Sequence, residues 1–144
     1  MRASTNCSAC YHSQMQDILV PISPGELLDK ITILRIKSAR MSDAGKLANV
    51  RHELRLLEQT WATAVPPGVD LADEERALQE VNERLWDVED RLRDLEAAKR
   101  FDEDFTGLAR AVYFNNDERA AIKKRINTRL GSALVEEKSY RPYA

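Results

Sequence analysis

The chain is poor in aromatic residues, cysteine, glycine and proline. Phe, Trp and Tyr together make up 6% of its 144 residues, beside five glycines, five prolines and two cysteines. Charged residues, by contrast, make up 32%. Few aromatic residues combined with many charges are typical of long solvated helices rather than of sheets. The length suits one domain with a sizeable core, which we place at residues 17–144.

Long hydrophobic runs are also absent, and neither sign of charge dominates. The longest apolar runs span only a few residues, as at residues 18–20, which excludes a transmembrane helix and a signal-peptide core. The 22 basic and 24 acidic residues leave a net charge near −2, which gives no general attraction to nucleic acid or membranes. We therefore expect a cytoplasmic protein with no membrane span and no nucleic-acid partner.

Two segments carry a seven-residue apolar repeat. Within residues 70–98, leucines recur at positions 71, 78, 85 and 92, and residues 44–64 repeat the spacing with Leu47, Leu54 and Trp61. Only another helix buries such a seam well, so the fold is predicted to be mainly α, an antiparallel helical bundle with coiled-coil-like packing. The two seams can close on each other as a hairpin within the chain, or between two chains in a homodimer.

The strongest local signal begins a different helix. Ser23-Pro24-Gly25-Glu26 combines an N-cap serine, a proline in the first helical position and a glutamate that completes a capping box. The helix that follows is apolar over so much of its surface that we expect it to pack on two sides and to be the most buried. Asn115-Asn116-Asp117 is predicted to separate the last two helices. The predicted helices are residues 24–41, 44–64, 70–98, 103–114 and 117–130.

The two ends of the chain differ from its helical part. Residues 1–16 are polar and Ser-rich, and we predict a disordered leader there, or a mis-assigned start with Met15 as the true initiator. The β-rich segments 18–22 and 133–140 can pair as a small two-stranded ribbon, because lone strands leave backbone groups unpaired.

Two clusters were candidates for metal binding. Cys7, Cys10 and His12 are spaced for zinc or for a redox pair, but zinc needs four ligands, and His52 lies off the apolar stripe of a predicted helix. Residues 70–96 hold eleven acidic residues against four arginines, a ladder that could bind Mg²⁺ as in all-α nucleotide pyrophosphohydrolases. The interleaved arginines favour a solvated face instead. We predict no metal and no cofactor.

The last predicted helix is basic. Residues 117–130 hold five basic and two acidic side chains, a net charge of +3. This charge can attract the acidic helix at residues 70–98. It can also form an anion site, since a helix N-terminus adds free N–H groups and a positive dipole end.

Three patches carry a resemblance to known proteins. Residues 19–34 (LVPISPGELLDKITIL), 112–127 (VYFNNDERAAIKKRIN) and 137–140 (EKSY) resemble a family of small bacterial helical proteins catalogued only as a domain of unknown function. The resemblance extends from about residue 17 to residue 140. It implies no established activity, cofactor or catalytic residue.

These patches contain polar residues that helix packing alone does not require. Arg119, Lys123 and Asn127 are spaced four apart and share a helix face, which can converge with the start of the helix at residues 24–41. One interpretation is a cleft for a small anion, such as a phosphorylated or carboxylated metabolite. The other is a buried network of salt bridges and caps that fixes the fold. The candidate residues are Glu26, Asp29, Lys30, Asn116, Asp117, Arg119, Lys123, Asn127, Lys138 and Tyr140.

The leading functional hypothesis is a binding or scaffold module, with a partner protein, a homodimer or a small anionic ligand. The alternative is a small all-helical enzyme acting on an anionic metabolite, either metal-dependent like the pyrophosphohydrolases or similar to chorismate mutases. The latter place Arg and Lys from long helices around a dicarboxylate, and Lys30, Arg35 and Lys37 are the matching candidates here. Their burial discriminates, because a basic side chain of this helix pointing into a polar cavity favours the enzyme.

Overall fold

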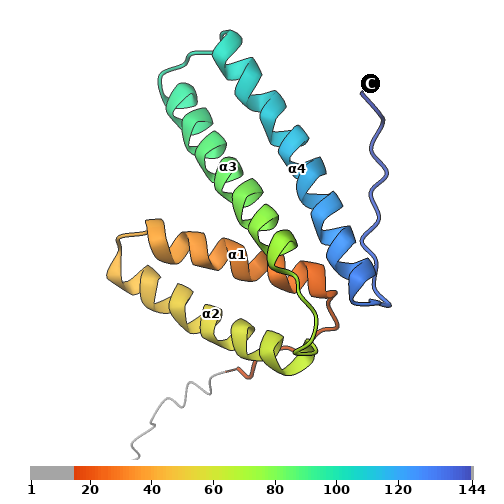
Figure 1. Cartoon of the computed structure of the whole chain (residues 1–144). Coiled ribbons are helices and arrows are strands. Elements are labelled where there is room, and N and C mark those ends of the chain that lie inside the picture. Colours follow the sequence, from red (N-terminus) through yellow and green to blue (C-terminus); the bar gives the residue numbers. More distant parts are fainter. Residues whose placement is uncertain (1–14, 144) are drawn as a thin grey trace, which may run out of the picture.

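A computed structural model describes residues 15–143, and the predictions made for residues 1–14, including Cys7 and Cys10, lie outside this range. The described part consists of two helical hairpins joined by a linker (Figure 1). The first hairpin is α1 (Pro24–Arg40) and α2 (Ala44–Ala64), and the second is α3 (Ala72–Ala97) and α4 (Glu103–Arg129). A mainly helical bundle is thereby confirmed.

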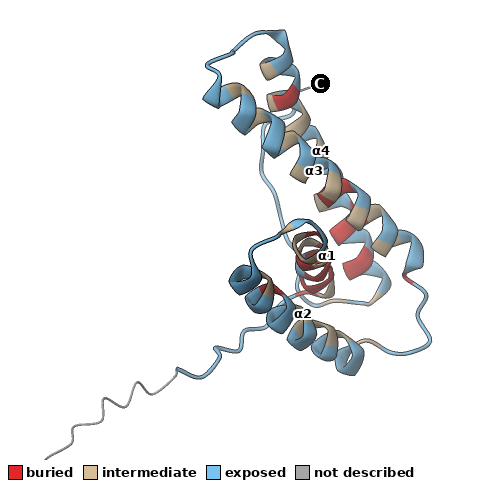
Figure 2. Cartoon of the chain, turned by 90° about the vertical axis from the view of Figure 1, so that its left-hand side faces the viewer, coloured by how far each residue is buried: buried red, intermediate tan, exposed pale blue. Residues whose placement is uncertain are grey.

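Helix α1 is the centre of the fold. Its predicted N-cap is present, because the hydroxyl of Ser23 accepts a hydrogen bond from the Glu26 N–H at 3.2 Å and Pro24 opens the helix. The predicted capping box is not completed, since the Glu26 carboxylate pairs with Lys123 of α4 instead of the Ser23 N–H. Helix α2 packs on one side of α1, and α3 and α4 pack on the other. Eight residues of α1 are buried, more than in any other described helix, and Figure 2 shows much of α1 in the red of buried residues. The prediction of a helix packed on two sides is confirmed.

The core lies where α1 crosses the facing ends of α3 and α4. Leu28 of α1 packs there in one cluster with Leu78 and Val81 of α3 and with Ile122 and Ile126 of α4, and all five are almost fully buried. Beyond this crossing the α3–α4 hairpin projects alone (Figure 1). The core thus sits at one end of the long hairpin rather than along it.

The predicted pairing of the two heptad seams within the chain is wrong. Helix α2 packs only on α1, and α3 packs along α4, while the backbones of α2 and α3 do not approach each other. The linker containing Pro66, Pro67 and Gly68 turns the chain so that α3 leaves across α1. A heptad seam specifies a helical partner but not which helix supplies it.

The predicted break at residues 115–117 is also wrong, because α4 runs unbroken through it. The side-chain amide of Asn115 donates to the Ala111 carbonyl at 2.8 Å within the helix, and its oxygen accepts from Arg84 of α3 at 2.9 Å. Arg84 also pairs with Glu118, one residue past the predicted break. Packing along α3 outweighs the weak helix propensity of Asn and Asp.

The predicted two-stranded ribbon does not form, since residues 15–143 contain no strand. Residues 18–22 run beside α2, whereas residues 133–143 run beside α4 on the other side of the molecule (Figure 1). Pro21 lacks the N–H that pairing needs, and side-chain contacts hold the C-terminal segment to α4 instead. None of the four helices has the length and apolar character needed to cross a bilayer.

Candidate functional site

A buried carboxylate links three helices. Asp29 of α1 is 1% exposed, and Arg119 of α4 grips it with two nitrogens, Nε at 2.8 Å from Oδ1 and a second guanidinium nitrogen on Oδ2. Asn82 of α3 donates to the same Oδ1 at 2.9 Å. A bidentate arginine–carboxylate pair is among the strongest and most directional of polar contacts. The predicted convergence of α4 with the start of α1 is therefore present around Asp29.

Two further polar groups complete this junction. The Asn82 amide also donates to the hydroxyl of Thr32 at 2.9 Å, and that hydroxyl donates to the backbone carbonyl of Asp29 at 2.8 Å. Neither residue was among the sequence candidates. Asn82 carried a signal, because it lies four residues after Leu78 on the apolar seam, where a polar side chain needs a partner.

Lys123 is the second cation of the site. Its side chain is 9% exposed, and Nζ lies 2.6 Å from Glu26 Oε2, 2.9 Å from Glu136 Oε2 and 3.9 Å from Asp29 Oδ2. Burial lowers the pKa of Lys123, but the hydrogen bonds to Glu26 and Glu136 outweigh it, so its pKa is raised above the ordinary value. The hydrogen bonds that Arg119 donates to Asp29 raise the pKa of Arg119 as well. Both cations are therefore charged at neutral pH.

A close backbone approach sets the position of Glu26. The N–H of Gly25 donates to Asn127 Oδ1 of α4 at 2.7 Å. A Cβ atom at Gly25 would lie only 2.5 Å from the carbonyl oxygen of Lys123, so a side chain there would push the helices apart. The contact brings the first turn of α1 onto α4 and Glu26 within reach of Lys123.

A small polar cavity of about 200 Å³ opens beside these groups, which we call the polar cavity. Three cations, Arg119, Lys123 and Lys138, meet the carboxylates of Glu26 and Glu136 there, with Asp29 behind them. Lys123 lowers the pKa of Glu136 through their hydrogen bond. The charges balance, three against three, so in this arrangement the cavity has no surplus positive charge.

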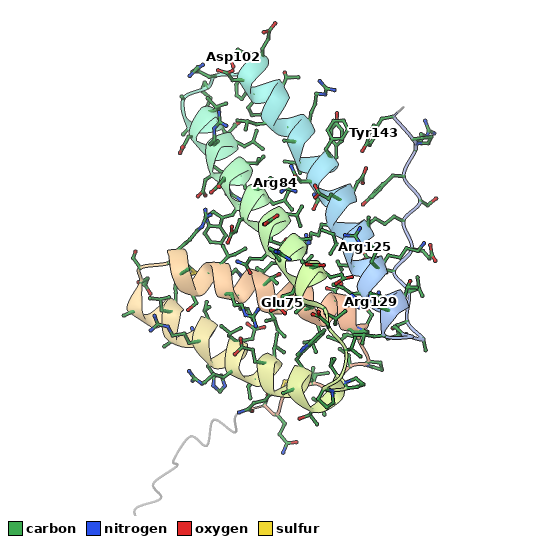
Figure 3. All side chains as sticks on the ribbon, viewed as in Figure 1. Glu75, Arg84, Asp102, Arg125, Arg129 and Tyr143 are labelled. Atoms are coloured by element: carbon green, nitrogen blue, oxygen red, sulfur yellow. The ribbon has the colours of Figure 1, made fainter. Side chains whose placement is uncertain are left out.

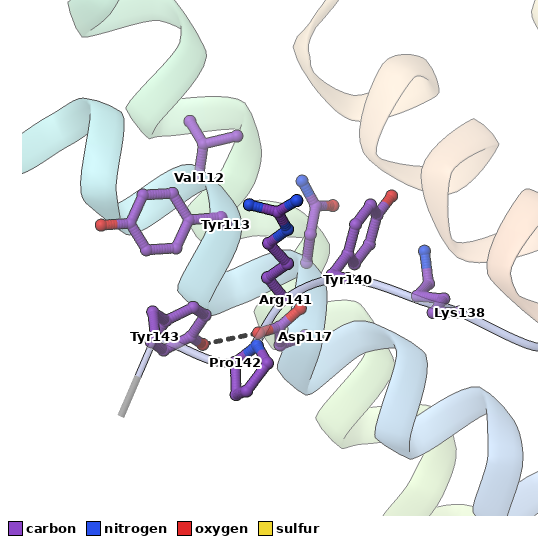
Figure 4. Close-up of a pocket in the computed structure, with 9 residues that line it drawn as sticks. Val112, Tyr113, Asp117, Lys138, Tyr140, Arg141, Pro142 and Tyr143 are labelled. Atoms are coloured by element: carbon purple, nitrogen blue, oxygen red, sulfur yellow. Dashed lines mark hydrogen bonds between the residues drawn. The ribbon is translucent and has the colours of Figure 1, made fainter.

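A larger cavity of about 690 Å³ lies between α4 and the C-terminal segment, and we call it the tail cavity (Figure 4). The ring of Tyr143 packs against Tyr113 with centroids 5.3 Å apart, and its hydroxyl donates to Asp117 Oδ2 at 2.5 Å. Arg141 forms no ion pair within residues 15–143. The lining residues are Val112, Tyr113, Asn116, Asp117, Lys138, Tyr140, Arg141, Pro142 and Tyr143.

The ten sequence candidates divide into three groups. Glu26, Asp29, Arg119, Lys123 and Asn127 converge in the buried junction. A second group lines the tail cavity: Asn116, Asp117, Lys138 and Tyr140. The third group is Lys30 alone, which is exposed on α1 and contributes to neither place.

The sequence reasoning missed several residues that the geometry makes important. Glu136 and Arg141 carried no pattern signal, because they lie in a segment without helix or strand. Tyr113 lies in the 112–127 patch of α4, where the sequence gives no sign of a binding role, since an aromatic residue on a helix usually packs in a core.

The structure also bears on the hypotheses of an arginine-lined enzyme site, of a basic helix attracted to the acidic one, and of a metal site. Arg35 pairs with Glu58 of α2 and with Glu75 of α3, and it lines neither cavity. Figure 3 labels Glu75 near the start of α3, where this helix meets α1. Of the basic residues at 117–130, Arg119 and Lys123 pair with α1, Arg129 pairs with Glu74 of α3 at 2.7 Å, and Lys124 and Arg125 are exposed. Within residues 15–143, no group of three or more His, Cys, Asp or Glu side chains is placed to hold a metal ion.

Comparison with known proteins gives one match. The model of a family of unknown function, DUF6165, matches residues 18–143. No curated protein and no solved structure matches the chain. The matched range contains every helix, the buried junction and both cavities. The chain is therefore a member of the DUF6165 family, as its three signature patches indicated.

Proposed function

We propose that this protein binds a small organic anion that carries a flat ring, and that the tail cavity is the binding site. The carrying observation is the cavity itself. Its volume of about 690 Å³ falls within the range of roughly 300–1,000 Å³ typical of small-molecule sites. Apolar and aromatic walls with a few polar groups are also typical of such sites.

The lining groups indicate the chemistry of the ligand. Tyr113 and Tyr140 offer ring faces from α4 and from the C-terminal segment, and planar molecules stack on such faces. Arg141 offers a guanidinium with no acidic partner in residues 15–143, suited to a carboxylate or phosphate. The Lys138 ammonium lies 5.4 Å from the centre of the Tyr140 ring, where the cavity turns toward the polar cavity.

The buried junction, which we define as Asp29, Asn82, Arg119 and Lys123, supports this assignment because its polar groups are already paired with one another and with neighbouring carboxylates. Asp29, Asn82 and Arg119 satisfy one another across three helices, and Lys123 has three carboxylates within 4 Å. Groups so fully paired contribute to holding the helices together and leave little unpaired charge for a ligand. We assign the junction to the fold and the tail cavity to binding.

A thermal-shift screen of the full chain tests the proposal. The panel contains sugar nucleotides, phosphosugars and aromatic carboxylates, each with an uncharged analogue. A ligand at a hundred times its dissociation constant adds about 2.7 kcal/mol and raises the midpoint by roughly 5–11 °C. We expect at least one ring-bearing anion to do so and its uncharged analogue not to.

Two variants locate the binding. Arg141→Gln should remove most of the shift, because it removes the unpaired cation of the tail cavity. Lys124→Gln, an equal charge change at an exposed position of α4 outside both cavities, should leave the shift intact. A panel without a single shift, or a shift that survives Arg141→Gln, contradicts the proposal.

A further inference from the structure

Glu136 differs from the other carboxylates around Lys123. Glu26 and Asp29 both project from α1, where helix packing fixes them. Glu136 comes from the C-terminal segment, which has neither helix nor strand. Its carboxylate lies 2.9 Å from Lys123 Nζ and 3.4 Å from Lys138 Nζ, so it bridges the cations of the polar cavity.

We propose that the Glu136 carboxylate occupies an anion subsite, and that an anionic group of the ligand takes its place when the ligand binds. This inference rests on the proposed function and names the second half of the binding site. The ring and one acidic group lie in the tail cavity with Arg141, and a second carboxylate or phosphate of the same ligand reaches Lys123 and Lys138 in the polar cavity.

The positions of the two cavities fit one ligand that spans both. Asn116 of α4 and Lys138 of the C-terminal segment line the polar cavity and the tail cavity alike, so the two spaces adjoin. The polar cavity is small, about 200 Å³, and almost entirely polar in its lining. Such a space suits a single anionic group better than a ring.

When the Glu136 carboxylate leaves, the net charge of the polar cavity becomes more positive, as the binding of an anion requires. Arg119, Lys123 and Lys138 then face only the two carboxylates of α1, which leaves one positive charge uncompensated. One carboxylate or singly charged phosphate restores the balance. A partly buried lysine favours such a replacement because an unpaired charge there is costly.

Glu136 can leave without disturbing the core. Its side chain is 41% exposed, and every residue from 133 to 143 is exposed, so moving this stretch uncovers no buried apolar side chain. The segment has a second attachment at Tyr143, whose hydroxyl and ring hold it to α4. Segments with few buried contacts open at low free-energy cost. Asp29, buried within the helical junction, cannot exchange in this way.

Inorganic phosphate serves as the probe in a titration followed by the thermal midpoint. Wild-type protein is compared with Glu136→Gln and with Glu137→Gln, in chloride buffers of equal ionic strength. Glu137 is the neighbouring exposed residue, so Glu137→Gln repeats the charge change and the general salting effect of phosphate without touching Lys123.

We expect the apparent dissociation constant for phosphate to fall about tenfold in Glu136→Gln, because an internal competitor that occupies the site most of the time has been removed. Glu137→Gln should match wild type. Adding Lys138→Gln to Glu136→Gln should reverse the gain. Glu136→Asp, which keeps the charge but shortens the side chain, should gain less than Glu136→Gln.

Equal phosphate affinity in Glu136→Gln and Glu137→Gln would overturn the inference, as would a gain that survives Lys138→Gln. Ligand binding in the tail cavity and the anion subsite at Lys123 can fail independently of each other. If Arg141→Gln abolishes binding of a screened compound while Glu136→Gln gains nothing for phosphate, the tail cavity stands and the subsite falls. If phosphate affinity rises and no ring-bearing anion binds, the subsite stands alone.

Discussion

The two halves of the α3–α4 hairpin share one heptad pattern and differ in burial. In the half that α1 crosses, Leu78 and Val81 are 0% exposed. Further along the same seam, Leu85 and Leu92 remain half-buried. The difference follows the third helix, because α1 supplies Leu28 to the cluster around Leu78 and Val81, whereas further along α3 it contributes the exposed Arg40, which contacts Trp86 and Asp87. A heptad seam predicts that a helix packs against another helix. How deeply the residues of the seam are buried depends on how many helices pack around them.

Polar contacts differ between the two halves in the same way. At the crossing, Asp29 and Asn82 are buried and bond to each other. Further along, Arg84 pairs with Glu118 while both side chains remain about half exposed. Exposed pairs contribute roughly 0–1 kcal/mol, whereas breaking a buried pair costs far more. The substitutions below test whether this contrast holds.

The largest effect is expected from Asp29→Ala. It leaves the Arg119 guanidinium and the Asn82 amide without their common acceptor in a buried place, which should lower the free energy of unfolding by about 3–5 kcal/mol. Asp90→Ala, on an exposed face of α3, should change it by less than about 0.5 kcal/mol. Urea unfolding measures both, and similar losses would remove the distinction between the two regions.

Leucine truncation tests the apolar side of the comparison. Leu78→Ala should cost about 2–5 kcal/mol, because it opens a cavity in the core. Leu92→Ala removes the same atoms from a half-exposed position and should cost roughly 1 kcal/mol. Equal losses in urea unfolding would mean that the projecting half is buried in solution, for instance by a second copy.

Replacement by alanine is expected to change stability in opposite directions at two glycines. Gly25→Ala should destabilise the protein by about 1–3 kcal/mol, since its Cβ would overlap the Lys123 carbonyl oxygen. Gly107→Ala, on α4 in the projecting half, meets nothing within 4 Å and should stabilise by about 0.5–1 kcal/mol. Thermal midpoints that move in the same direction would contradict the close approach of α1 to α4.

The smallest expected effect is a decrease of the thermal midpoint at acid pH. The hydrogen bond from Lys123 lowers the pKa of Glu136, and that from Arg129 lowers the pKa of Glu74. A lowered folded pKa gives stability that is complete above the unfolded value of about 4.3 and is lost as the pH falls through the folded pKa. The thermal midpoint should therefore fall below about pH 4, and less steeply in Glu136→Gln. Identical pH profiles would show that Glu136 does not pair with Lys123.

Local signals in the sequence predicted most of the fold. The capping box at Ser23 located the start of α1, and the wide apolar stripe indicated its burial on two sides. The heptads located α2 and α3 within two residues of their bounds. Such signals depend on neighbours a few positions away, which the chain itself displays.

Features that depend on distant neighbours were not predictable in the same way. Asn115 and Asp117 favour a helix end by themselves, and only the contact with Arg84 of α3 keeps α4 continuous. The spacing of Arg119 and Lys123 predicted a shared face. It did not indicate that Asn82 and Glu136 would meet them, because those residues come from another helix and from an irregular segment.

We assign the buried junction to holding the helices together and the tail cavity to binding. Equilibrium unfolding of the double variant Arg119→Met, Lys123→Met measures the contribution of the junction. Both substitutions keep much of the side-chain volume but leave Asp29 and Glu26 without their cations. We expect a loss of several kcal/mol, or no cooperative transition at all. A cooperative transition of undiminished stability would show that these two cations are not needed to hold the helices together.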